Sequence, residues 1–165
     1  YTGALKVLQM IFSYEYLWIQ IRVKGGAYGC MCSFSDQGDS MFVTYRDPNL
    51  SESYKVYDEA ADYVADFDAD DRDMKKYIIG TIGSMDMPME AVDMGARSFH
   101  AYFLGKTEAD LQKVRDQVLS CTQEDIRALA PIVKAVVEAG NRCCIGNEEK
   151  IDQNKEYFDE VKHVL

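Results

Sequence analysis

The chain has 165 residues, a length that suits one domain with a hydrophobic core. Hydrophobic residues make up 47% of the chain, which is typical of a folded protein and not of a disordered one. Its formal net charge of −10 gives a surface that repels phosphate backbones and anionic lipids. We therefore expect neither nucleic acid nor a membrane as a partner.

The first predicted element is a helix over residues 4–22. Its polar residues fall near one stripe, and apolar residues cover most of the remaining surface. Such a wide apolar surface predicts burial on more than one side, against a sheet and against another domain. Gly25-Gly26 predicts the end of this helix, because glycine readily adopts the left-handed backbone that closes a helix.

A β-hairpin is predicted next. Residues 28–34 alternate between larger side chains and mostly small or polar ones, with a period of two, which indicates a strand. Residues 36–39 form a turn, and residues 40–46 return as the second arm. Pro48 then stops the strand, because proline has no N–H to donate to the ladder.

The rest of the chain is predicted to be mostly helical. Asn49 followed three residues later by Glu52 resembles a capping box, which predicts a helix through about Phe67. The other predicted helix starts are Asp70, Thr107, Thr122 and Asn147. Pro131 should kink or split the helix that begins at Thr122, because its ring displaces a carbonyl.

The last predicted strand covers residues 142–145, after Gly140 has ended the preceding helix. With the hairpin it would make a narrow three-stranded sheet. The predicted fold class is therefore α+β, a small antiparallel sheet packed by several helices, over a single domain of residues 1–165. We expect this sheet to lack a strand that precedes Tyr1.

The five cysteines do not form a disulfide framework. Cys30 and Cys32 share one strand face, Cys143 and Cys144 are adjacent, and neither pair has the C-x-x-C spacing of a strong metal motif. We interpret them as small buried hydrophobic residues in a reducing compartment, and we expect a cytoplasmic location.

Other motifs fail their tests. Residues 66–70 copy the start of a calcium-binding loop, but Asp71 and Tyr77 stand where that loop needs glycine and glutamate. His100 and His163 lie on separate predicted elements, and no H-x-x-E-H motif is present. The sequence therefore predicts no metal site in this chain, because catalytic zinc normally takes three protein ligands.

Arg22 and Tyr28 lie on either side of the glycine pair, and two interpretations are open. A cation in the last helical turn interacts favourably with the free carbonyls there, and a tyrosine at the start of a strand is ordinary packing. Alternatively, the two side chains form half of an active site.

The segment "LWIQIRVKGGAYG", residues 17–29, resembles the C-terminal half of the insulinase/pitrilysin family of zinc metallopeptidases, nearest to the presequence-protease-like subfamily. The resemblance continues through "VTYRDPNL", "DIRALAP" and "CCIGNEEKI", so it covers nearly the full chain. It implies that the chain is a C-terminal fragment of a larger peptidase. It also implies one half-unit of the inverted-zincin, processing-peptidase-like metallohydrolase fold.

The resemblance also implies a division of roles. An absent N-terminal half of the same polypeptide would bind zinc, while Arg22 and Tyr28 would be catalytic and would reach a peptide substrate across a closed chamber. Gly25, Gly26 and Ala27 would lie against the substrate. The two donors would stabilise negative charge on the peptide carbonyl oxygen, so the isolated chain should be inactive. The alternative is a non-catalytic scaffold domain of the same fold.

Overall fold

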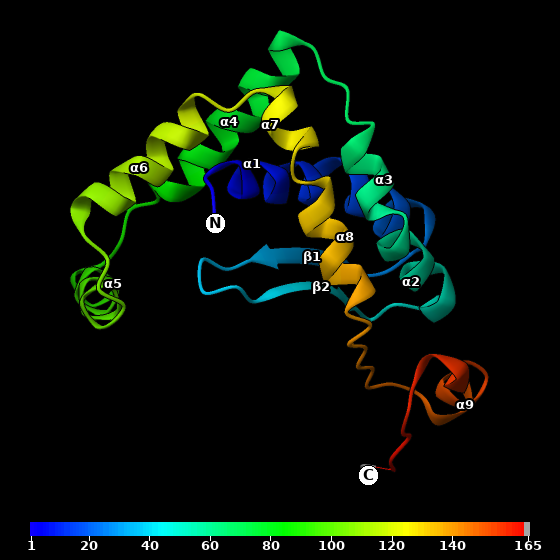
Figure 1. Cartoon of the computed structure of the whole chain (residues 1–165). Coiled ribbons are helices and arrows are strands. Elements are labelled where there is room, and N and C mark those ends of the chain that lie inside the picture. The colour runs from blue at the N-terminus through cyan, green and yellow to red at the C-terminus, as the bar shows by residue number, and fades with distance from the viewer. Residues whose placement is uncertain (164–165) are drawn as a thin grey trace.

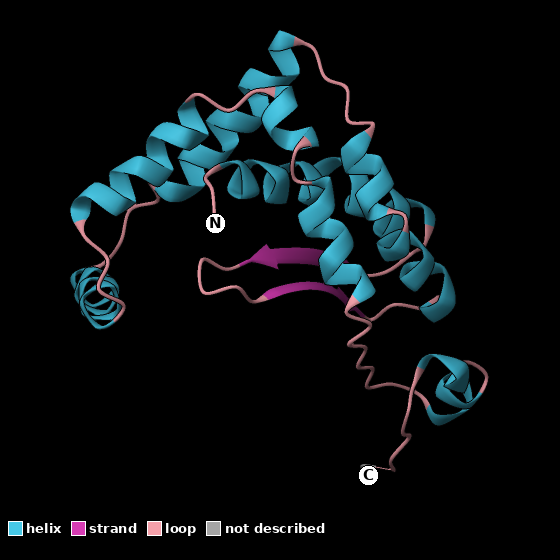
Figure 2. Cartoon of the chain, viewed as in Figure 1, coloured by secondary structure: helices cyan, strands magenta, loops and turns pink. Residues whose placement is uncertain are grey.

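The computed structural model describes residues 1–163 of the chain. The structure combines several helices with one two-stranded antiparallel sheet, and the first helix packs on one side of that sheet (Figure 1 and Figure 2). The predicted α+β class with a small antiparallel sheet is confirmed. The elements in chain order are α1 (Ala4–Ile11), η1 (Phe12–Tyr16), η2 (Trp18–Lys24), β1 (Gly29–Phe34), β2 (Ser40–Tyr45), α2 (Leu50–Asp58), α3 (Ala60–Ala65), α4 (Asp71–Met85), α5 (Ala91–Phe103), α6 (Glu108–Leu119), α7 (Gln123–Arg127), α8 (Ala130–Glu138), α9 (Glu148–Asp152) and η3 (Lys155–Tyr157).

The first helix runs without a break from α1 through η1 and η2. Its hydrogen bonds change from the α to the wider π pattern after Ile11, and Leu17 between the two π segments keeps helical torsions of φ −65° and ψ −41°. The predicted helix over residues 4–22 is confirmed and extends to Lys24. Stretches of π-helix are rare and often occur at functional sites.

This first helix supplies much of the core. Leu8, Ile11, Phe12 and Leu17 are completely buried. The hairpin lies on one side of α1, and α4, α6 and α7 cover the other (Figure 1). Burial on two sides is thus confirmed for α1, but the second cover comes from helices of this chain and not from another domain.

The predicted hairpin is confirmed. Strands β1 and β2 pair in the register Gly29 with Tyr45 through Phe34 with Ser40. Cys32 and Phe34 point into the core, where the ring of Phe34 lies 6.3 Å from that of Phe12, while Met31 is exposed on the opposite face. The period-two pattern therefore identified the buried face of β1.

The helix starts at Asp70, Thr107 and Thr122 are confirmed. Asp70 accepts hydrogen bonds from two backbone N–H groups of α4, and both threonines form capping boxes, with Asp110 and Asp125 respectively. These caps need only residues within one turn, which explains why the sequence predicts them. The structure also breaks between α7 and α8 beside Pro131, as predicted.

The capping box predicted at Asn49 is wrong. The Asn49 side chain makes no cap to its own helix and instead donates from Nδ2 to the backbone oxygen of Gly25, while Glu52 accepts from Ser51. The oxygen at the end of the first helix competes for this side chain, and no local pattern reveals that contact. The predicted helix is also divided, into α2 and α3.

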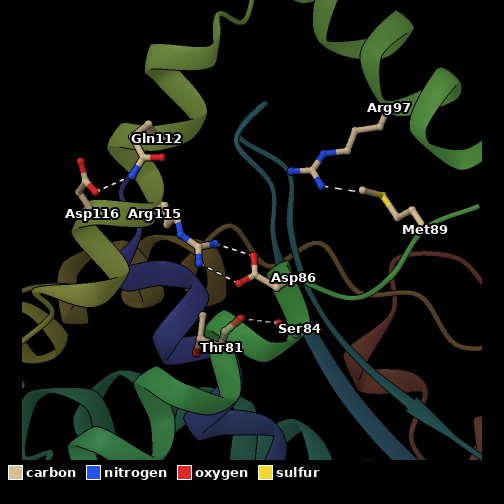
Figure 3. Close-up of polar contacts among 8 residues, drawn as sticks. All are labelled: Thr81, Ser84, Asp86, Met89, Arg97, Gln112, Arg115 and Asp116. Carbon is tan, nitrogen blue, oxygen red and sulfur yellow. Dashed lines mark hydrogen bonds and ion pairs between the residues drawn. The ribbon is translucent and has the colours of Figure 1, made fainter. Parts of the chain in front are cut away.

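Helix α5 was not predicted from the sequence. None of its side chains is buried, and in Figure 1 it lies at one end of the molecule, away from the sheet. It connects to α4 through the loop that follows Asp86. Arg115 of α6 donates two hydrogen bonds to the Asp86 carboxylate, at 2.5 and 2.7 Å, and so joins α6 to the end of α4 (Figure 3).

The third strand predicted over residues 142–145 is wrong. These residues form a loop, and the Arg142 guanidinium carbon lies 5.1 Å from the ring centre of Tyr54 and 5.3 Å from that of Tyr157. Arg142 also forms an ion pair with Asp58 at 3.3 Å. These contacts attach the segment to α2, so its backbone does not pair with the hairpin.

The closing helix predicted from Asn147 is confirmed only at its start. Asn147 caps α9, which has five residues and is followed by the short 3₁₀ turn η3. Residues 164 and 165 of the predicted single domain lie outside the described residues. Within residues 1–163, no helix is both long and apolar enough to cross a bilayer.

Candidate functional site

The first helix and the hairpin meet at a tight reversal. The N–H groups of Gly25, Gly26 and Ala27 donate to the oxygens of Gln20, Arg22 and Ile21 respectively, which closes the end of η2. Gly26 has φ +77°, the left-handed conformation that the sequence predicts for this glycine pair. The reversal places the end of the helix beside the start of β1.

Arg22 and Tyr28 lie close together at this reversal. The guanidinium carbon of Arg22 is 5.6 Å from the ring centre of Tyr28 and 4.6 Å from that of Trp18. Tyr28 is 63% exposed, and Arg22 is half-buried. The structure therefore presents both predicted catalytic side chains at the surface, where a ligand can reach them.

The three residues predicted to lie against substrate differ in exposure. Gly26 is exposed and Gly25 is half-buried, but the Ala27 side chain is only 3% exposed and belongs to the core. Ala27 could therefore contact a ligand only through its backbone. A Cβ on Gly25 would lie 2.5 Å from the Ile21 oxygen, so the helix end leaves no space for a side chain there.

Three further residues line the same site and were not predicted. Trp18, Val23 and Arg46 join Arg22 and Tyr28 around a shallow surface pocket of about 450 Å³. The guanidinium carbon of Arg46 lies 5.8 Å from the Tyr28 ring centre and 5.3 Å from that of Tyr45. Arg46 could have been predicted from the hairpin register, because extending the register by one pair places Arg46 opposite Tyr28. The Tyr28 N–H donates to the Arg46 oxygen.

The site is cationic within an acidic protein. The ion pairs among the described residues lie elsewhere, and neither Arg22 nor Arg46 takes part in one. A phenol hydroxyl and guanidinium N–H groups are all hydrogen-bond donors. Together they suit an oxygen that carries, or is developing, negative charge.

The two buried cysteines, Cys32 and Cys121, do not resemble nucleophiles. Burial raises the pKa of the Cys32 and Cys121 thiols to about 12, which keeps both protonated at neutral pH. Residues 1–163 contain no group of three His, Cys, Asp or Glu side chains placed to hold a metal ion. The interpretation as small buried residues is confirmed for Cys32. Cys121 is buried as well, Cys30 and Cys144 are half-buried, and Cys143 is exposed.

Comparison with known proteins gives consistent matches. Residues 1–147 match the family model described as the PreP C-terminal domain. The chain is 41% identical over its full length to "Protein HypA" of Clostridium perfringens, covering 17% of that protein. It is 33% identical over 99% of its length to presequence protease 1, chloroplastic/mitochondrial, of Arabidopsis thaliana, covering 16% of that protein. The mitochondrial presequence protease of Aspergillus fumigatus is 34% identical over 90% of this chain, which covers 14% of that protein.

Proposed function

Because this chain belongs to the PreP C-terminal domain family, we propose that it is the substrate-binding part of a longer endopeptidase that degrades unfolded peptides. The chain spans less than a fifth of the relatives above, which supports its being one part of a larger polypeptide. Its fold would be one half-unit of the inverted-zincin, processing-peptidase-like architecture. The N-terminal half of the same polypeptide would be its partner.

One observation supports this proposal above the others: Arg22 and Tyr28 converge at the surface, 5.6 Å apart from guanidinium carbon to ring centre. The chain reversal brings the two side chains together, and both line a pocket that is open to a ligand. Attack on a peptide bond develops negative charge on the carbonyl oxygen, and the two donors are suited to stabilise that charge. A scaffold domain would need neither donor.

Zinc would be the cofactor of the longer enzyme, and the residues that the structure describes do not form a site for it. The described residues offer no three-ligand group, so we derive no catalytic step through a metal here. The role proposed for this chain is to bind and orient the peptide and to donate hydrogen bonds to its carbonyl oxygen. Catalysis would then depend on closure of the two halves. A cytoplasmic location stays a prediction.

Tyr28→Phe in the longer enzyme tests the role of the hydroxyl. We expect turnover to fall by about a hundredfold, because one oxyanion donor typically contributes that much, while zinc content stays unchanged. The measurements are kcat on an unfolded peptide and metal analysis of the same preparation. Tyr102→Phe is the matched control, since Tyr102 is 81% exposed on α5, and it should retain full activity.

Unchanged turnover in Tyr28→Phe would assign the tyrosine to packing and favour the scaffold alternative. A second measurement uses the 165-residue chain alone. The proposal expects neither peptide cleavage nor stoichiometric zinc in this chain. Peptide cleavage by this chain alone, or stoichiometric zinc bound to it, would contradict the division of roles between the two halves.

A further inference from the structure

We propose that Arg46 is a further ligand-binding residue of this site and that, together with Arg22, it binds a carboxylate group of a peptide. That the ligand is a peptide rests on the function proposed above. The binding itself requires no catalysis and can be measured separately. The carboxylate could be the C-terminus of the peptide or an acidic side chain, since the two share the same chemistry.

The backbone of Arg46 is strained. Its φ is +49°, and no other residue except glycine has a positive φ among the described residues. A left-handed backbone costs an L-residue roughly 1–2 kcal/mol, and such strain concentrates at binding and catalytic sites. A glycine would remove this cost, so the arginine at this position is explained better by its side chain than by its backbone.

A network of hydrogen bonds holds the backbone around Arg46 in place. Its oxygen accepts the Tyr28 N–H at 3.3 Å, beyond the last pair of the hairpin. The adjacent Asp47 accepts hydrogen bonds from the Asn49 N–H and the Ser53 hydroxyl, so its carboxylate is directed to its own turn. Asn49 in turn donates to the Gly25 oxygen. The turn is thereby attached to the end of the first helix, which fixes the backbone of Arg46 relative to that helix end, while the Arg46 side chain is exposed.

Two guanidinium groups therefore approach the ring of Tyr28, at 5.6 Å for Arg22 and 5.8 Å for Arg46. Trp18 supports Arg22, and Tyr45 supports Arg46, each through a cation–π contact. Neither arginine forms an ion pair with a described residue, although the chain has 28 acidic side chains against 18 basic ones. In so acidic a protein, two unpaired arginines at one pocket point to an anionic ligand.

A carboxylate fits these groups better than a neutral carbonyl. The planar guanidinium can donate two parallel hydrogen bonds to the two oxygens of a carboxylate. Both arginines line the same pocket, so an anion bound there would be attracted by both cations. Hydrogen bonds to charged groups contribute about 1.5–3 kcal/mol each, so we expect loss of Arg46 to weaken binding by about tenfold or more.

The 165-residue chain has one tryptophan, and it lies under Arg22, so its fluorescence reports on this pocket. The experiment titrates three acetylated tripeptides into the chain: trialanine with a free carboxylate, its C-terminal amide, and the amide with a central glutamate. We expect the free carboxylate, the glutamate peptide or both to change the Trp18 emission. The neutral amide should not. Whichever carboxylate peptide binds identifies the source of the ligand group.

Arg46→Gly is the decisive variant, because glycine accepts the positive φ and the turn should fold without strain. It should weaken carboxylate binding by about tenfold or more. Arg46→Lys keeps the charge but loses the planar fork, and it should bind with intermediate affinity. Arg72→Ala, which removes an exposed arginine of α4, should bind as the parent chain does. Equal affinities for the carboxylate and amide peptides, or unchanged binding in Arg46→Gly, would overturn the proposal.

The outcome is separable from that of the proposed function. In the longer enzyme, Arg46→Gly should raise KM for a peptide that contains the preferred carboxylate and leave kcat close to that of the parent. If Tyr28→Phe lowers turnover while Arg46→Gly changes neither binding nor KM, the peptidase role stands and the carboxylate site fails. If carboxylate binding depends on Arg46 but Tyr28→Phe has full turnover, the carboxylate site stands and the proposed catalytic role of Tyr28 fails.

Discussion

The chain between Arg22 and Tyr28 reverses direction at two glycines that serve different purposes. Gly26 has φ +77°, a conformation that an L-residue adopts only at a cost. Gly25 has an ordinary negative φ of −81°, but a side chain there would collide with the Ile21 oxygen. The separation of the two catalytic candidates therefore depends on backbone freedom at one position and on space at the other.

Gly26→Ala should lower the free energy of unfolding by roughly 1–2 kcal/mol, because it places a Cβ on a left-handed residue. The Cβ itself would meet nothing closer than Pro48 at 3.9 Å, so the cost is conformational. Gly29→Ala is the matched control, since Gly29 has open space and no positive φ, and it should change stability by less than about 0.5 kcal/mol. Urea denaturation of both variants measures the difference. Equal stabilities would contradict the argument.

Helix α6 packs closely against Gly3, the residue that precedes α1. A Cβ on Gly3 would lie 2.4 Å from the Val114 oxygen and 2.9 Å from the Val118 nitrogen, both backbone atoms of α6. The Gly3 N–H also donates to the Gln117 side chain at 2.9 Å. The absence of a side chain at Gly3 therefore allows α6 to cover the start of α1.

Gly3→Ala should destabilise the protein by about 1–3 kcal/mol, because α6 must move away from α1 to admit the methyl group. Gly83→Ala gives the opposite sign. Gly83 lies within α4 with open space around it, so alanine should stabilise the helix by about 0.5–1 kcal/mol. Thermal unfolding of the two variants should shift in opposite directions. A Gly3→Ala variant as stable as the parent would show that the contact is loose.

At the scale of the whole molecule, the core holds several ionisable groups in their neutral form. Burial raises the pKa of Cys32 and of Cys121 to about 12, and it raises that of Tyr63 to about 12 as well. Burial also raises the pKa of Tyr16, whose hydroxyl donates to the Val56 oxygen at 2.8 Å. In the unfolded chain these groups would ionise at their ordinary values, near 9 for the thiols and 10 for the phenols.

This difference predicts a loss of stability at alkaline pH. Below about pH 8 both states bind the same protons, whereas between pH 9 and 12 the unfolded chain releases thiol protons that the folded chain keeps. The unfolded state is then favoured as pH rises. The two thiols together should lower the free energy of unfolding by roughly 2–3 kcal/mol between pH 8 and pH 10.

Urea denaturation in reducing buffer at the two pH values measures this effect. Cys121→Ala should reduce the difference between the two pH values by about 1–1.5 kcal/mol, the contribution of one buried thiol. A free energy of unfolding that is equal at pH 8 and pH 10 would show that the thiols ionise equally in both states.

Those features that depend on neighbouring residues could be predicted from the sequence. The caps at Asp70, Thr107 and Thr122 each need only a side chain and the next turn of backbone. The hairpin and the closure at Gly26 are local in the same sense. The sequence therefore determined these three helix starts, the buried face of β1 and the two side chains that flank the glycine pair.

Tertiary structure decided the features that need residues distant in the chain. Arg142 bound the side chains of α2 and so formed no third strand, and Asn49 bound the Gly25 oxygen in place of its own helix. Helix α5 buries no side chain, so the apolar residues of this helix do not pack in the core. Arg46 joined the candidate site because strand pairing brings it opposite Tyr28. Such contacts form between segments that are far apart in sequence. A pattern of neighbouring residues does not show which distant segment a side chain will contact.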